Sequence, residues 1–424
     1  MEARDGRNSD DAAPQGCAKK QTRDGGETHQ YRALAHTDAH AAYIHIPFCV
    51  RKCAYCDFLS FPSCVDQIPE YVEALCREIG LSEKFWGENK SELTSVYFGG
   101  GTPSLLSPLQ VEKILGALRK VFTLSEDCEI TLEANPGTID EEKLRGFREA
   151  GVNRLSIGIQ SLDDSVLTAL GRIHDAATAR QAVFDAKGTG FQNISCDMML
   201  GIPGQSRAAV ESTLSFFLQQ EIPHVSLYSL ILEEGTPMYA RYDGDIEKYV
   251  SQEEDRELYH LVVNTLRTQG YSHYEISNMA KSGFESRHNM MYWRAENYYA
   301  FGLGAHYYLD DERGTHKAET IEEYIGSFVA DGVKGEVVKD DIYEVEEKLT
   351  SEEKKKEFMM LAFRTGKGVE GQVFEKRFGC SVESAFGEEL EKEIQSGLVE
   401  KTEGGYRLTE KGFDLANQVF SDYV

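Results

Sequence analysis

The sequence predicts an α/β fold, a partial (β/α)6 TIM-like barrel followed by an α+β domain that resembles a winged helix. Between Ala42 and Leu230, six short apolar runs alternate with longer amphipathic ones. This alternation with long crossovers is typical of a parallel sheet covered by helices. Six such units fall short of the eight that close a TIM barrel, so we expect an open barrel. After residue 349 the pattern changes to three helical segments, a strand pair and a last helix.

Each unit of the barrel, which spans residues 41–235, pairs a short apolar strand with a following amphipathic helix. The strands are expected at residues 42–46, 94–98, 129–133, 154–159, 193–200 and 224–230. The helices are expected at residues 67–86, 108–122, 140–150, 163–170, 176–187 and 207–219. Ligands in such folds bind at the carboxyl ends of the strands, so the loops that follow the strands are the candidates for function.

A connecting α/β region is expected at residues 236–345, with a long helix at 252–269. Its strand-like segments lie near residues 272–276 and 299–308.

The winged-helix-like domain is expected at residues 346–424, with its strand pair at 398–401 and 406–408. From Lys348 onward the chain has 12 basic and 15 acidic residues. A nucleic-acid reader needs a basic surface, so a packing or lid role is the favoured interpretation.

The composition indicates two or three domains in a reducing compartment. The 424 residues include 45 basic and 71 acidic side chains, a net charge of −26, which disfavours nucleic acid and anionic lipid as partners. Nine cysteines without a disulfide framework fit a reducing cytosol, so we expect a cytoplasmic location. No apolar stretch approaches the roughly 20 residues that span a bilayer.

Residues 1–40 are expected to be a disordered N-terminal extension. They contain almost no large apolar side chains before Tyr31, so they cannot bury enough surface to become ordered. A transit peptide is the alternative, but seven acidic residues stand among six basic ones, and transit peptides are poor in acids.

Three cysteines within eight residues give the most specific signal: Cys49, Cys53 and Cys56 have the spacing C-x3-C-x2-C. One loop can place three thiolates on a [4Fe–4S] cluster and leave one iron without a protein ligand. That open iron suggests a further ligand. A structural zinc site needs a fourth ligand, and none follows at close spacing. Buried inert thiols are the remaining alternative.

A second loop, Gly99-Gly100-Gly101-Thr102, ends the second predicted strand. Glycines let backbone groups approach a ligand without interference from a Cβ atom, although such a turn also serves as a tight exit from a strand. Both loops leave the same edge of adjacent strands. A shared small-molecule site is therefore the favoured interpretation.

The triad and the glycine turn resemble those of the radical S-adenosylmethionine (SAM) proteins, over roughly residues 42–310. The resemblance implies a [4Fe–4S] cluster on Cys49, Cys53 and Cys56, with SAM on the open iron. It also implies a low-potential electron donor such as a flavodoxin or ferredoxin. The cofactors carry the chemistry in such proteins, and the protein positions them.

The run Tyr43-Ile44-His45-Ile46-Pro47-Phe48-Cys49 resembles the opening strand of the coproporphyrinogen-dehydrogenase-like branch. Strand-end carboxylates can accept ribose hydroxyls, and an arginine can pair with a carboxylate through its planar fork. For any single residue, a structural salt bridge or a helix cap is the alternative. The resemblance implies that these residues contact SAM or lie against the cluster: Tyr43, Tyr55, Gly99, Gly100, Gly101, Thr102, Glu133, Gln160, Arg172 and Asp197.

Asp57 and Phe58 follow the third cysteine, where the porphyrinogen-oxidising enzymes of this branch carry Gly-Cys. Those enzymes also have an ordered N-terminal segment that helps to enclose the substrate. Both departures disfavour decarboxylation of coproporphyrinogen.

The string His288-Asn289-Met290-Met291-Tyr292-Trp293 resembles that of the HemW-type haem chaperones. The resemblance implies haem contact through His288, Tyr292 and Trp293. Histidine is a common axial haem ligand, tyrosine is a rarer one, and aromatic faces suit a porphyrin. Taken without the resemblance, the string fits a packed histidine beside core aromatics.

The sequence therefore predicts a haem chaperone that binds haem and a SAM-ligated [4Fe–4S] cluster and transfers haem to an acceptor haemoprotein. Its partners are a haem donor and an acceptor, with any peripheral membrane contact made through a partner. The alternative is an oxygen-independent coproporphyrinogen III dehydrogenase. A nucleic-acid-modifying radical SAM protein is a third hypothesis, which the acidic balance disfavours. The sequence leaves open whether SAM is cleaved.

Overall fold

The computed structural model describes residues 38–329 and 337–424. The predicted disordered extension, residues 1–40, lies outside the described residues except for its last three.

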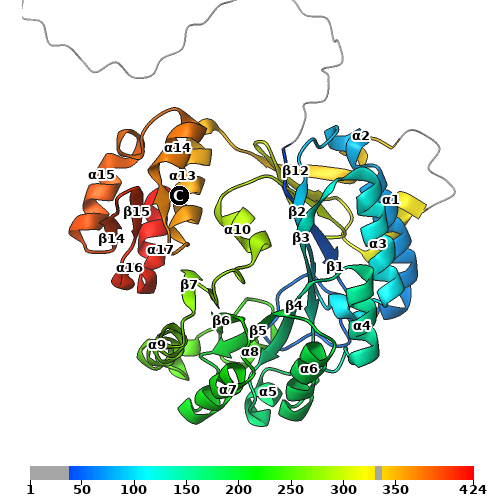
Figure 1. The fold of residues 1–424 in the computed structure, drawn as a ribbon, viewed down its shortest axis with the longest axis horizontal. Coiled ribbons are helices and arrows are strands. Elements are labelled where there is room, and N and C mark those ends of the chain that lie inside the picture. Colours follow the sequence, from blue (N-terminus) through cyan, green and yellow to red (C-terminus); the bar gives the residue numbers. More distant parts are fainter. Residues whose placement is uncertain (1–37, 330–336) are drawn as a thin grey trace, which may run out of the picture. The chain divides into compact units, whose positions relative to one another are not determined.

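The centre of the fold is a parallel sheet formed by six strands that follow one another in chain order (Figure 1). They are β1 (Ala41–Ile46), β2 (Leu93–Gly100), β3 (Leu124–Ala134), β4 (Arg154–Gln160), β5 (Asn193–Leu200) and β6 (His224–Ser229). Each neighbouring pair is parallel, which confirms the six predicted strands. All seven residues of β4 are buried, as expected for a strand covered on both faces.

The region predicted as a connection adds strands to both edges of this sheet. The resulting order is β12-β11-β10-β9-β1-β2-β3-β4-β5-β6-β8-β7. Only β9 is parallel to its barrel neighbour, β1, and the other added pairs are antiparallel. The added strands are β7 (Ser272–Glu275), β8 (Asn278–Ala280), β9 (Tyr298–Phe301), β10 (His306–Leu309), β11 (Glu312–His316) and β12 (Tyr343–Lys348). The sheet stays open between β12 and β7, as predicted.

The single strand predicted at residues 299–308 is two antiparallel strands, β9 and β10. The chain reverses where Gly302 and Gly304 adopt φ angles of 103° and 77°, which favour glycine. A Cβ atom on Gly302 would lie 2.6 Å from the carbonyl oxygen of His45. The glycine pair therefore lets this turn pack against the end of β1.

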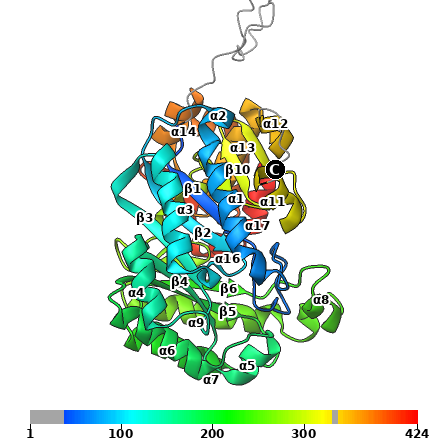
Figure 2. The same cartoon turned by 90° about the vertical axis from the view of Figure 1, so that its right-hand side faces the viewer.

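Helices cover the outer face of the parallel sheet (Figures 1 and 2). They are α1 (Ile68–Gly80), α2 (Ser82–Trp86), α3 (Pro108–Val121), α4 (Glu141–Ala150), α5 (Asp164–Ala169), α6 (Ala176–Gly188) and α7 (Arg207–Gln219). The helix predicted at residues 67–86 is thus two helices, which break at Leu81. Ser107, Asp140, Asp175 and Ser206 cap the N-termini of α3, α4, α6 and α7 with their side chains, which explains where these helices begin.

The C-terminal residues form a small α+β domain with its own apolar core, as predicted. Its three-stranded sheet has the order β13-β15-β14 and includes the predicted strand pair. The two-residue strand β13 is too short to recognise in the sequence. The elements are α13 (Ser351–Phe363), β13 (Val369–Glu370), α14 (Gly371–Phe378), α15 (Val382–Gln395), β14 (Val399–Lys401), β15 (Gly405–Leu408), α16 (Glu410–Asp414) and α17 (Ala416–Phe420).

Five further helices lie between the barrel and this domain along the chain. They are α8 (Pro237–Arg241), α9 (Gln252–Thr268), α10 (Arg287–Trp293), α11 (Ile321–Val329) and α12 (Lys339–Ile342). The string that begins at His288 thus forms most of α10, which contacts β2 and α13 (Figure 1). Every helix among the described residues is too short or too polar to cross a bilayer.

Candidate cofactor site

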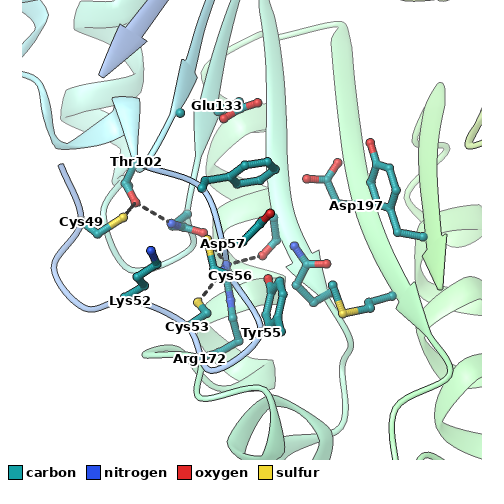
Figure 3. Close-up of a pocket in the computed structure, with 18 of the residues that line it drawn as sticks. Cys49, Lys52, Cys53, Tyr55, Cys56, Asp57, Thr102, Glu133, Arg172 and Asp197 are labelled. Carbon is teal, nitrogen blue, oxygen red and sulfur yellow. Dashed lines mark hydrogen bonds between the residues drawn. The ribbon is translucent and has the colours of Figure 1, made fainter. Parts of the chain in front are cut away.

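A pocket of about 380 Å³ lies at the carboxyl ends of the parallel strands, where the loop that carries the three cysteines crosses them (Figure 3). Strands β2 to β6 and the loops after them all contribute residues. Among the residues singled out from the sequence, those that line the pocket are Cys49, Cys53, Tyr55, Cys56, Gly100, Gly101, Thr102, Glu133, Gln160, Arg172 and Asp197. The topology therefore brings one triad and eight further predicted residues to a single small-molecule site.

Tyr43 and Gly99 are not among the residues that line this pocket. Tyr43 lies on β1 directly beside Tyr97 of β2, and its hydroxyl hydrogen-bonds with Nδ1 of His45 at 3.1 Å. A Cβ atom on Gly99 would lie 2.8 Å from the Tyr43 ring, so this glycine makes room for the tyrosine. Contact of Tyr43 and Gly99 with SAM stays a prediction.

Gly100 and Gly101 let β2 pass close to the cysteine loop. Gly100 has a φ of 113°, and a Cβ atom there would lie 2.6 Å from the imidazole of His45. A Cβ atom on Gly101 would lie 2.6 Å from the carbonyl oxygen of Phe48, the residue before the first cysteine. The glycine turn thus fixes the approach of the cysteine loop and leaves its own backbone at the pocket wall.

The cysteine loop is held to the neighbouring strand ends by hydrogen bonds that involve its sulfurs. The hydroxyl of Thr102 donates to Sγ of Cys49, and Nη1 of Arg172 donates to Sγ of Cys53, both at 3.5 Å. The backbone N–H of Ala54 donates to the carbonyl oxygen of Leu170 at 3.0 Å. These contacts fix the positions of Cys49 and Cys53, two of the three candidate cluster ligands.

The donor set fits an iron–sulfur cluster. A [4Fe–4S] cluster takes each thiolate on a different iron, and the cysteine loop places three thiolates at one pocket. The residues present therefore fit a cluster bound by Cys49, Cys53 and Cys56.

Two carboxyl groups, Glu133 and Asp197, lie half-buried in the pocket wall. Burial raises the pKa of Glu133 to about 7 and that of Asp197 to about 6, although hydrogen bonds oppose both shifts. The hydroxyl of Tyr97 donates to Glu133 at 2.8 Å, and that of Ser156 donates to Asp197 at 3.3 Å. Near neutral pH, such groups can both accept and donate hydrogen bonds, which suits the hydroxyls of a ribose.

Two buried polar atoms in the pocket wall have no hydrogen-bond partner among the described residues, Oε1 of Gln160 and Nε of Arg172. Gln160 also has a φ of 64°, which is unusual for a residue other than glycine. Nη2 of Arg172 donates to the carbonyl oxygen of Gly158 at 2.7 Å, which fixes the guanidinium beside the pocket. Buried polar atoms without partners indicate that a polar ligand belongs here.

Several residues of the pocket escaped the sequence interpretation, and three of them are Asn135, Met199 and Tyr228. Nδ2 of Asn135 donates to the hydroxyl of Thr102 at 2.9 Å and so connects two loops. The signal for all three was their position, because each lies at or just beyond the carboxyl end of a predicted strand. Asp57 and Phe58 also line the pocket.

The string on α10 lies outside this pocket, and its histidine faces the sheet. His288 is 1% exposed, and its ring nitrogens hydrogen-bond with the hydroxyls of Ser95 at 3.0 Å and Tyr292 at 2.8 Å. Burial, together with the charge of Arg154, lowers the pKa of His288 to about 3, so the ring is neutral. Within this structure, neither nitrogen is directed at solvent.

Trp293 ends α10 and packs against the C-terminal domain. The guanidinium of Arg364 lies 4.3 Å from the centre of its ring, a cation–π contact. Its indole Nε1 is buried without a hydrogen-bond partner among the described residues. Haem contact through His288, Tyr292 and Trp293 stays a prediction. In the structure these side chains join the barrel to α13.

Two family profiles match the chain, and together they cover both domains. That of the radical SAM superfamily matches residues 43–217, and that of the HemN C-terminal domain matches residues 349–415. The first match contains the cysteine loop and every strand end of the pocket up to β5. The second corresponds to most of the small α+β domain.

Curated relatives match the chain almost from end to end. The haem chaperone HemW of Lactococcus lactis is 35% identical over 384 residues, which are 91% of this chain and 97% of that protein. HemW of Bacillus subtilis is 35% identical over 385 residues, 91% of this chain and 99% of that protein. Among solved structures, coproporphyrinogen III oxidase (HemN) of Escherichia coli aligns with a TM-score of 0.75 over 91% of this chain and 90% of that one. At 19% identity, this last similarity shows the fold alone.

Proposed function

The chain belongs to the HemW family of radical SAM proteins, and on that premise we propose that it is a haem chaperone. It binds haem and a SAM-ligated [4Fe–4S] cluster, and it delivers the haem to an acceptor haemoprotein. The observation that carries this proposal is the similarity to HemW proteins over 97% to 99% of their length, which includes both the cysteine pocket and α10.

In this proposal, Cys49, Cys53 and Cys56 bind the cluster, and SAM occupies the rest of the pocket. Glu133 and Asp197 face the ribose, because their raised pKa values let them exchange hydrogen bonds with hydroxyl groups near neutral pH. Oε1 of Gln160 and Nε of Arg172, which have no hydrogen-bond partner among the described residues, supply further polar contacts to SAM. When bound, the cluster and SAM supply electron transfer to a sulfonium, and the protein residues orient them.

An oxygen-independent coproporphyrinogen III dehydrogenase is the alternative, since the fold is shared with HemN. One local feature favours the chaperone. Phe58, whose side chain is 66% exposed, lines the pocket at the position where porphyrinogen-oxidising enzymes carry a further cysteine. The alternative predicts conversion of propionate to vinyl groups with turnover, and the chaperone does not.

The partners that this function requires are a haem donor, an acceptor haemoprotein and a low-potential electron donor such as a flavodoxin or ferredoxin. A cytoplasmic setting fits the cysteines, of which the eight among the described residues are free. Any membrane contact is made through a partner protein. Nucleic acid is not a partner in this proposal, because the net charge of −26 repels phosphate.

The test is a haem titration of protein purified anaerobically, followed by mixing with an apo-haemoprotein. We expect saturable haem binding, and then transfer that restores the absorption spectrum of the acceptor. Protein with Cys53→Ser serves as the comparison for the role of the cluster in transfer. Absence of haem binding by the cluster-loaded protein would refute the chaperone function, and vinyl-group formation from coproporphyrinogen III would establish the alternative.

A further inference from the structure

Helix α10 has a second face, which borders a cavity of about 1120 Å³ between β7 and the C-terminal domain. In Figure 1, α10 lies between β2 and α13, with β7 below it. Residues after α13, on β15 and on α16 close the other side of the cavity. Cavities that hold ligands of drug size measure about 300–1,000 Å³. The pocket at the cysteine loop, at about 380 Å³, is only a third as large.

Polar and apolar atoms share the inner surface of this cavity about equally, and its apolar part comes from both walls. It includes the thioethers of Met290 and Met291 from the string, the ring of Tyr271, and Leu408 and Phe413 from the C-terminal domain. Methionine side chains adapt to flat and irregular ligands because they are flexible and polarisable. This mixed surface suits an amphiphilic ligand with a flat apolar face.

Charged side chains surround the apolar surface, and cations predominate among them. Five cationic residues line the cavity, against three acidic ones, in a chain whose net charge is −26. Three of the cations have carboxylate partners: Arg267 pairs with Glu410, Arg287 with Asp127, and Arg407 with Glu400.

The other two cations are Arg294, which follows α10, and Lys367, which follows α13. Neither has an ion-pair partner among residues 38–329 and 337–424, and both are exposed. They belong to two segments of the cavity wall that are far apart in the chain, one after α10 and one after α13. A ligand with two carboxylates on one edge can pair with both when that edge lies between them.

Resting on the proposed function, we propose that haem binds in this cavity, with its two propionates on Arg294 and Lys367 and its macrocycle against Met290 and Met291. The ligand class is a planar apolar molecule with two carboxylates. This chemistry matches both the apolar surface and the two cations without partners. The cofactor pocket is left to the cluster and SAM.

His288 and Tyr292 are positioning residues in this arrangement. His288 hydrogen-bonds with Ser95 of β2 and with Tyr292, which fixes α10 to β2, while Met290 and Met291 of the same helix line the cavity. The string thus supports the haem site through the helix that it forms. The proposal expects His288→Ala to weaken haem binding less than loss of the two cations does.

The test uses full-length protein with its cluster reconstituted anaerobically, titrated with haem and followed by absorbance. The variant Arg294→Glu/Lys367→Glu should bind haem at least tenfold more weakly, with unchanged iron content and melting temperature. The control Lys120→Glu/Lys376→Glu makes the same change in net charge at exposed lysines away from the cavity, and should bind as the wild type does. A third variant, Ser272→Trp, fills the cavity from the exposed first residue of β7 without a charge change and should also weaken binding.

Haem dimethyl ester, which lacks both carboxylates, tests whether the propionates of haem contact Arg294 and Lys367. The wild type should bind the ester at least tenfold more weakly than haem, and the Arg294→Glu/Lys367→Glu protein should show no such preference. Equal haem affinity of this variant and the wild type, or an undiminished preference for haem over the ester, overturns the inference. If the wild type itself binds no haem, the proposed function fails, and the two failures are thereby told apart.

Discussion

The phenol ring of Tyr97 stacks on the imidazole of His288, with ring centres 5.0 Å apart and planes inclined by 27°. The hydroxyl of the same tyrosine donates to Glu133 in the cofactor pocket at 2.8 Å. One side chain of β2 therefore touches both the pocket wall and α10. Glu133 and His288 are thus both in contact with the same side chain.

Tyr97→Phe should lower the free energy of unfolding by about 1–2 kcal/mol, because it removes one hydrogen bond to a buried carboxyl group. It should also raise the pKa of Glu133 further, since that hydrogen bond holds it down. Urea unfolding measures the first effect, and SAM affinity as a function of pH measures the second. Tyr249→Phe, at a tyrosine that is 48% exposed, is the matched control and should change neither quantity.

Glu133→Gln should change how stability depends on pH. The folded pKa of about 7 lies above the ordinary value of 4.5, so between these values the folded state holds a proton that the unfolded state has lost. The contribution of this group to the free energy of unfolding therefore falls as the pH rises from 4.5 to 7, by at most about 3 kcal/mol. The Glu133→Gln variant lacks this decrease in the free energy of unfolding, because glutamine does not titrate.

The measurement is the difference in unfolding free energy between Glu133→Gln and the wild type at several pH values. The difference should shift in favour of the variant as the pH rises through this window, and level off above 7. Glu126→Gln, an exposed position on the same strand, should give a flat difference. A flat difference for Glu133→Gln as well would contradict the burial of its carboxyl group.

His288→Ala should destabilise the protein by about 2–4 kcal/mol, because it leaves a cavity beside Tyr97 and removes two hydrogen bonds. The wild-type ring stays neutral down to a pKa of about 3, below its ordinary value of 6.5. Its contribution to stability is therefore fully present above pH 6.5 and is lost as the pH falls toward 3, and the variant lacks this dependence. Thermal unfolding at pH 5 and pH 7 checks both statements, with His306→Ala at an exposed strand position as the control.

Cys53→Ser should abolish assembly of the cluster and lower bound iron to a small fraction of the wild-type value, because two thiolates cannot replace three. Cys380→Ser, in the C-terminal domain, should retain full iron content. Iron analysis and the absorption of the anaerobically reconstituted proteins measure both. The fold should persist in Cys53→Ser, since the loop is held by other contacts such as Ala54 to Leu170. Equal iron in the two variants would exclude the triad as the cluster ligands.

The sequence predicted the six parallel strands because each is a buried apolar run, and the sites at their ends followed from the topology. Edge strands were harder to predict. In β12, only Tyr343 is buried and the five residues after it are exposed, so its sequence shows no apolar pattern. Its pairing depends on β11, which no local signal reveals.

Within the site, the structure brings together the cysteines, carboxylates and arginine that the sequence placed at strand ends, because the carboxyl ends of parallel strands meet at one edge of the sheet. Their contacts with the cluster and SAM stay a prediction. Tyr43 and Gly99 differ, because alternate residues of a strand point to opposite faces and the exact turn decides which ones reach the pocket. The cavity beside α10 could not be predicted, because it is formed by segments far apart in the chain. No local pattern encodes the separation between two packed domains.

The pairing of β1 with β9 constrains folding during synthesis, because the two strands are far apart in the chain. As the ribosome releases the polypeptide, β1 finds its first neighbour, β2, early, but its other edge stays bare until Tyr298–Phe301 has emerged. An unpaired strand edge is a template for association with other nascent chains. A chain released before β9 has been synthesised therefore exposes the edge of β1 and is prone to aggregate. The sheet can be completed only after residues 298–301 have been synthesised.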